Sequence, residues 1–94
     1  MTLKQATTEK EYIIRNINIE DDELNSFLFS LGCYAGEKIS VISHLKGGCI
    51  VSIKDSRYHI DNNLASSIVV WYIFWFLALK WRIQYENSFS GKSE

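Results

Sequence analysis

The sequence predicts a single all-β domain, a small closed barrel with one short helix, followed by an apolar helix-like tail at the C-terminus. Two observations carry this prediction. Short stretches in which apolar and polar residues alternate recur between residues 11 and 70, and one stretch with a helical period interrupts them. The 94 residues suffice for one domain but not for two. We place the barrel at residues 1–70 and the tail at 71–94, and we do not expect the tail to be an independent domain.

The first predicted strand begins at Glu11 and is rich in isoleucine. Ile13, Ile17 and Ile19 are spaced so that they share one face of an extended segment, and only Arg15 interrupts that face. Residues branched at Cβ favour strands, because they pack well on a pleated surface. We therefore expect a strand with these three isoleucines on its buried side.

A helix is predicted over residues 22–31. The acidic run Glu20–Glu23 supplies a cap and first-turn carboxylates, which favour the positive end of the helix dipole. Gly32 stands where a glycine often ends a helix with a positive φ. One apolar stripe at helical spacing, which we expect to dock on the barrel, is formed by Leu24, Phe27, Leu28 and Leu31.

The remaining strands are short and closely spaced. One begins after Gly36, and residues 49–60 predict a hairpin with its turn at 54–56. Asp61 and the two asparagines after it can cap one helical turn at 64–65, and residues 68–70 predict a final strand. In these strands, outward residues are expected to alternate with inward ones, and the inward residues are Ile39, Val41, Cys49, Val51 and Ile53.

Charge and motifs argue against several classes of function. Ten lysines and arginines balance eleven acids, whereas a protein that neutralises phosphates carries a basic excess. The chain has no phosphate-binding glycine loop and no recurrent catalytic or zinc-binding motif. We therefore predict no enzymatic activity, no cofactor and no nucleic-acid partner. The two cysteines, Cys33 and Cys49, are expected to be reduced thiols in the cytosol.

Metal binding is weighed against plainer interpretations of the same residues. Adjacent carboxylates such as Glu20–Glu23 more often cap a helix than hold a cation. In the plainer interpretation, His44 is a solvated loop residue, His59 is an outward strand residue, and Cys49 belongs to the core. Neither thiol has a base beside it in the sequence. The soft-ligand candidates, whose spacing matches no recurrent site, are His44, Cys49, Asp55, His59 and Asp61.

The order and spacing of several segments resemble the ferrous iron transport protein A (FeoA) family. The segment 28–41 contains a helix ending in Leu-Gly, a three-residue link, a glycine and a strand of alternating apolar residues. The segment 48–60 looks like the second hairpin of that family, and 64–70 like its closing turn and strand. The resemblance covers residues 2–70, and the aromatic tail has no counterpart in the family.

This resemblance implies a fold and a role. The fold is an SH3-like β-barrel. The role is that of a non-enzymatic cytoplasmic regulator of bacterial ferrous iron uptake, which binds the ferrous iron permease FeoB, a membrane protein with a GTPase domain, at the inner face of the membrane. The alternative is a free-standing relative of the SH3-like domain of iron-dependent transcriptional repressors, acting as a metal-responsive module. Fold alone does not decide between these roles.

The surface for a protein partner is expected around the link after the helix. Phe29, Cys33 and Tyr34 are the candidate contacts, because Phe29 lies off the apolar stripe and aromatic side chains are enriched in interfaces. Packing of Phe29 under the N-terminal segment is the equal alternative. No catalytic, cofactor-binding or metal-binding residue is predicted.

The tail contains every tryptophan of the chain and is apolar on all sides from Trp71 to residue 79. Left in water, it would expose a larger apolar patch than monomers usually carry. Because the segment Trp71–Arg82 shows almost no polar face before Lys80, we expect burial against protein, either on its own barrel or in a homodimer. Contact with a membrane surface is the second alternative.

Overall fold

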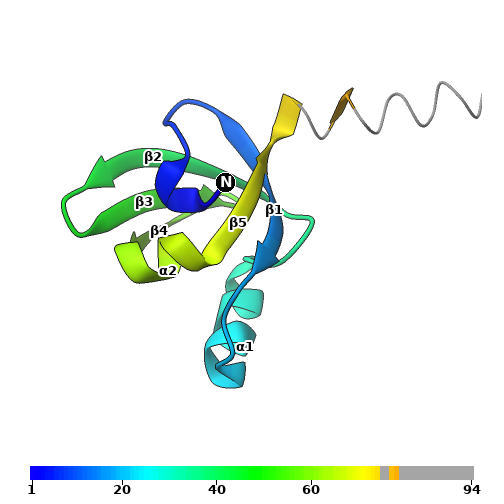
Figure 1. Cartoon of the computed structure of the whole chain (residues 1–94), viewed down its shortest axis with the longest axis vertical. Coiled ribbons are helices and arrows are strands. Elements are labelled where there is room, and N and C mark those ends of the chain that lie inside the picture. The colour runs from blue at the N-terminus through cyan, green and yellow to red at the C-terminus, as the bar shows by residue number, and fades with distance from the viewer. Residues whose placement is uncertain (75–76, 79–94) are drawn as a thin grey trace, which may run out of the picture.

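The computed structural model describes residues 1–74 and 77–78. Five antiparallel strands form one curled sheet in the order β4-β3-β2-β1-β5 (Figure 1). The all-β prediction with a short helix is confirmed, and a second helix and a 3-10 turn join it. In chain order the elements are η1 (Leu3–Gln5), β1 (Glu11–Ile17), α1 (Asp22–Leu31), β2 (Lys38–Leu45), β3 (Gly48–Ile53), β4 (Ser56–Asp61), α2 (Asn62–Ser67) and β5 (Ile68–Tyr72).

The buried face of β1 differs from the predicted one. Tyr12 and Ile14 enter the core, whereas Ile13 is buried outside the core cluster. Arg15 is an extra residue on β1, because Ile14 pairs with Val70 and Asn16 already pairs with Val69. Such a bulge reverses the alternation of inward and outward side chains. Ile17 and Ile19, on the far side of the bulge, pack against the core as expected.

Helix α1 has the predicted bounds and the predicted caps. The Asp21 carboxylate accepts hydrogen bonds from the backbone N–H groups of Glu23 and Leu24 at 3.0 and 3.1 Å. Gly32 ends the helix at φ 91°, and its N–H and that of Cys33 donate to helix carbonyls. These bonds satisfy groups that every helix end leaves without partners in the helix.

The apolar stripe of α1 is only partly buried, in contrast to the prediction. Leu28 is 3% exposed and belongs to the core. Leu24 packs against the core, Leu31 is half-buried, and Phe27 is 58% exposed. Figure 1 shows the reason: α1 hangs below one end of the sheet, and the small barrel covers only one side of it.

The hairpin over β3 and β4 is confirmed, and its turn is formed by Lys54 and Asp55, both with positive φ. Asp61 caps α2 by accepting a hydrogen bond from the N–H of Leu64 at 2.8 Å. Helix α2 lies against η1, β3 and β4, where it closes the base of the sheet. Val70 donates from its N–H to the carbonyl of Met1 at 2.9 Å, so the N-terminus covers part of the outer edge of β5.

Strand β5 continues two residues beyond the predicted barrel boundary, since Trp71 and Tyr72 pair with β1. Helical backbone follows at residues 73–74 and 77–78. Tyr72 packs against the core, whereas Phe74 and Leu77, 68% and 52% exposed, are not packed on the barrel. The rest of the predicted segment Trp71–Arg82 lies outside the described residues.

Candidate functional site

An apolar groove of about 240 Å³ runs between α1 and the sheet. One wall is the stripe of α1, and the other is formed by side chains from the β3–β4 hairpin and α2. We call it the α1 groove. Its lining residues are Leu24, Phe27, Leu28, Leu31, Cys33, Ile53, Tyr58, His59, Ile60 and Leu64.

Leu28 anchors α1 to the core near the C-terminal end of the helix, beside the groove. Cys33 donates from its N–H to the carbonyl of Leu28 at 2.9 Å, and both side chains are buried. Phe27, the residue before Leu28, lies on the rim of the groove and remains largely exposed. An apolar groove rimmed by an exposed aromatic ring is typical of a surface that receives an apolar segment of a partner.

A second patch lies off the buried stripe of α1. Phe29 is 64% exposed, and its ring centroid lies 4.6 Å from that of Tyr34. The ammonium of Lys54 lies 5.7 Å from the centroid of the Tyr34 ring and 3.6 Å from the Glu37 carboxylate. Tyr34, and after it Glu37, raise the pKa of Lys54 and so favour its charged form. We call Phe29, Tyr34, Glu37 and Lys54 the aromatic patch.

Gly32 lets Lys54 reach this patch. A Cβ at Gly32 would lie 3.0 Å from two carbons of the Lys54 side chain and 3.3 Å from Ile53. The glycine therefore permits both the positive φ at the helix end and the close approach of the lysine stem. Sequence reasoning found Phe29 and Tyr34 but missed Glu37 and Lys54, because no local pattern shows that the β3–β4 turn meets this link.

Cys33 does not lie on the predicted partner surface. Its side chain is 1% exposed and faces the core and the base of the groove, because the helix end turns it inward. Burial raises the pKa of the Cys33 thiol to about 11 and also raises the pKa of Cys49. Burial thus favours the protonated form of both free thiols, whereas the thiolate is the form that acts as a nucleophile or metal ligand.

The soft-ligand candidates take separate structural roles. His44 lies in β2 rather than in a loop, and its Nε2 donates to the carbonyl of Ala6 at 2.6 Å. Cys49 is a core residue, as the plainer interpretation expected, and His59 is exposed on β4. Asp61 is occupied as the cap of α2. Within residues 1–74 and 77–78, no three His, Cys, Asp or Glu side chains come close enough to hold a metal ion.

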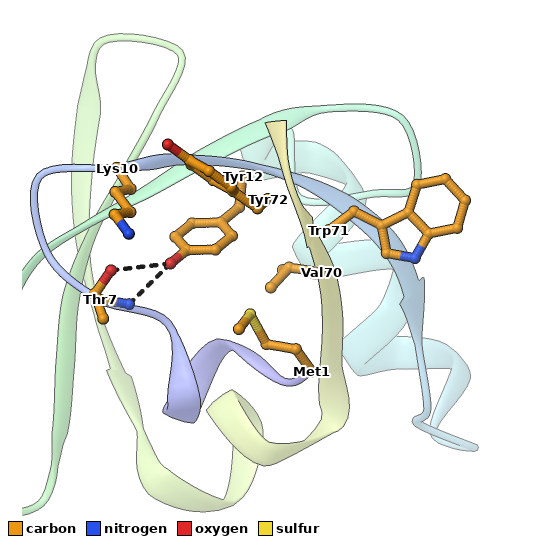
Figure 2. Close-up of a pocket in the computed structure, with 7 residues that line it drawn as sticks. All are labelled: Met1, Thr7, Lys10, Tyr12, Val70, Trp71 and Tyr72. Atoms are coloured by element: carbon orange, nitrogen blue, oxygen red, sulfur yellow. Dashed lines mark hydrogen bonds between the residues drawn. The ribbon is translucent and has the colours of Figure 1, made fainter. Parts of the chain in front are cut away.

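A pocket of about 440 Å³ lies at the other end of the barrel, where β5 leaves the sheet (Figure 2). The Tyr12 hydroxyl at its centre accepts a hydrogen bond from the N–H of Thr7 at 3.0 Å and lies 3.1 Å from the Thr7 hydroxyl. The Lys10 ammonium lies 5.1 Å from the centroid of the Tyr72 ring. Residues that line this pocket are Met1, Thr7, Lys10, Tyr12, Val70, Trp71 and Tyr72.

Sequence reasoning did not find this pocket, because its walls come from the two ends of the domain. The only local signal was the aromatic character of the residues after position 70.

In the part of the chain that the structure describes, no helix is long and apolar enough to cross a bilayer.

Known structures share this fold. The solution structure of iron(II) transport protein A from Clostridium thermocellum superimposes with a TM-score of 0.70 at 17% identity over 78% of this chain, which spans 46% of that protein. A crystal structure of FeoA described as an iron uptake regulatory protein gives a TM-score of 0.63 at 28% identity, covering 74% of this chain and 92% of that one. No curated protein matches the chain.

A third structure carries the description of the fold. FeoA from Stenotrophomonas maltophilia, solved with zinc and described as a prokaryotic SH3 domain protein, gives a TM-score of 0.65 at 19% identity over 74% of this chain and 88% of that one. The SH3-like fold expected from the sequence is thereby confirmed. The profile of the FeoA domain matches residues 1–71. This protein therefore belongs to the FeoA domain family.

Proposed function

We propose that this protein is a non-enzymatic regulator of bacterial ferrous iron uptake that works in the cytoplasm by binding a ferrous iron permease with a GTPase domain. Membership of the FeoA family and the iron-transport descriptions of its structural neighbours support a role in ferrous iron uptake. The permease as partner is the finer part of the proposal and follows from the family resemblance.

The observation that carries protein binding is the exposure of two large aromatic side chains on α1. Phe27 on the rim of the α1 groove and Phe29 on the aromatic patch are 58% and 64% exposed. Aromatic side chains at the centre of an interface contribute much of the binding energy. Together the two surfaces offer an apolar groove beside a charged pair, Lys54 and Glu37, which suits a polar rim.

The test measures binding of the full chain to the soluble GTPase-bearing region of the ferrous iron permease from the same organism, in the absence of lipid. We expect Phe27→Ser and Phe29→Ser each to weaken binding by roughly tenfold or more, as loss of an aromatic hot spot does. Leu45→Ser is the matched control, because Leu45 is 49% exposed on β2 and outside both surfaces.

The control variant is expected to bind within about twofold of the parent, as neutral contacts do. Failure of the parent to bind would reject the permease as the partner. Equal losses for all three variants would reject the α1 groove and the aromatic patch as the interface. Circular dichroism of each variant verifies that the exposed positions tolerate serine.

A further inference from the structure

We propose that the end of the barrel from which β5 departs binds the surface of an anionic lipid bilayer. This surface, which we call the β5 end, consists of Lys10, Arg15, Trp71, Tyr72, Phe74 and Leu77. It lies at the opposite end of the sheet from α1 (Figure 1), so it is separate from the proposed protein interface.

The apolar part of the β5 end is unusually exposed. Phe74 and Leu77 are 68% and 52% exposed, and Met1, which lines the pocket at this end, is 59% exposed. The sequence continues without a charge to residue 79 and then reads Lys80-Trp81-Arg82. Exposed apolar side chains that follow one another in this way often mark a surface that another apolar surface covers.

Whatever binds the β5 end has to accept positive charge as well as apolar side chains. The guanidinium of Arg15 lies 5.0 Å from the centroid of the Trp71 ring, and the ammonium of Lys10 lies 5.1 Å from that of Tyr72. Trp71 and Tyr72 are consecutive residues of β5, so the two cations flank the strand on its two faces where it leaves the barrel. Figure 2 shows the Trp71 ring pointing away from the pocket and Lys10 on the other side.

Aromatic rings next to lysine and arginine, followed by exposed apolar residues, match the layers of a bilayer surface. Tryptophan and tyrosine prefer the headgroup region, cations meet the lipid phosphates, and phenylalanine and leucine enter the acyl boundary. The acids nearest in sequence, Glu9 and Glu11, share a hollow beside β2 with Lys10, but neither acid lines the pocket at the β5 end, which Lys10 also lines. Among the residues that line this pocket, Lys10 is the one with a charged side chain.

A membrane surface fits these residues better than a second copy of the chain. A two-fold dimer through the β5 end would bring the same surface of both copies together, and with it Lys10 and Arg15 of each. Like charges opposed in this way disfavour association, whereas anionic lipid attracts both cations. The uncharged residues 73–79 are too few to cross a hydrocarbon core of about 30 Å even when extended, so the bilayer contact is one of surface binding.

The test uses the full chain with vesicles of phosphatidylcholine alone or mixed with phosphatidylglycerol. Binding is measured by co-sedimentation and by intrinsic fluorescence, which reports on this segment because Trp71, Trp75 and Trp81 are the chain's tryptophans. We expect binding to the anionic vesicles with a blue shift of the emission, and weaker binding at high salt.

Substitutions separate the apolar and the charged contributions. Phe74→Ser is expected to weaken partitioning by about tenfold, and Lys10→Gln and Arg15→Gln by about fivefold each. Leu45→Ser and Lys46→Gln, exposed residues of matched chemistry near the β2–β3 turn, are the controls and should change it by less than about twofold.

Two outcomes would overturn the proposal. One is the absence of binding to anionic vesicles, or a loss with Phe74→Ser no larger than with Leu45→Ser. The other is a concentration-dependent dimer whose emission is already blue-shifted in buffer, which would assign the β5 end to a second copy. Because the permease assay contains no lipid and alters α1, failure of either proposal leaves the other standing.

Discussion

Replacing Leu28 with alanine is expected to lower the free energy of unfolding by about 2.5–3 kcal/mol. Leu28 is 3% exposed and is the one residue of α1 that is fully buried in the core. Alanine removes three carbon groups, which corresponds to about 2.4 kcal/mol at about 0.8 kcal/mol for each. The additional cost of a void is small here, because the space opens onto the α1 groove and water can enter it.

The assay is urea unfolding followed by circular dichroism, with Phe27→Ala as the neighbouring comparison. Phe27 is 58% exposed, so its loss should cost less than about 1 kcal/mol. For a domain of this size, the Leu28 variant should also melt roughly 10–20 °C lower. The reasoning is refuted if Leu28→Ala costs less than about 1 kcal/mol, or if both variants lose the same stability.

Two further predictions concern a tight backbone contact and a buried thiol. Gly48→Ala should lower the free energy of unfolding by about 1–3 kcal/mol, because the new Cβ would collide with the backbone of β4. Gly47→Ala, with open space around it, should change the free energy of unfolding by less than about 0.5 kcal/mol. Thermal unfolding of the two variants is the test, and equal effects would refute the contact. Burial raises the pKa of Cys33 from 9.0 to about 11, so the folded state keeps a proton that the unfolded state loses. The contribution of this thiol to the free energy of unfolding should therefore be complete below about pH 9 and decrease towards pH 11. In urea unfolding at several pH values, Cys33→Ala should show a smaller decrease over this range than the parent protein. An equal decrease in both proteins would contradict the prediction.

Features set by local chemistry could be predicted from the sequence. The bounds of α1 follow from the capping carboxylate of Asp21 and from Gly32, and both act within one helical turn. The β3–β4 hairpin follows from strict alternation on either side of a short turn. Phe29 could be named as an exposed aromatic because its helical position lies off the apolar stripe.

Features set by contacts between distant segments could not be predicted. The bulges at Arg15 and Ile42 change the facing of a strand by one residue, and no local pattern marks them. Phe27 is exposed because the barrel covers only part of α1. That depends on the size of the barrel and not on the spacing of apolar residues along the helix. Lys54 joins the aromatic patch only because the sheet brings its turn to the end of α1.

The strand order has a kinetic consequence. Strands β2, β3 and β4 are neighbours both in sequence and in the sheet, so they can form a meander through short loops. Strand β1 pairs with β5, the last strand of the barrel, and this pairing closes a loop that contains α1, β2, β3, β4 and α2. Because contacts between residues distant in the sequence form more slowly than local ones, we expect the β1–β5 pairing to form later than the meander. We therefore expect the surface that we assign to the bilayer to form after the meander at the other edge of the sheet.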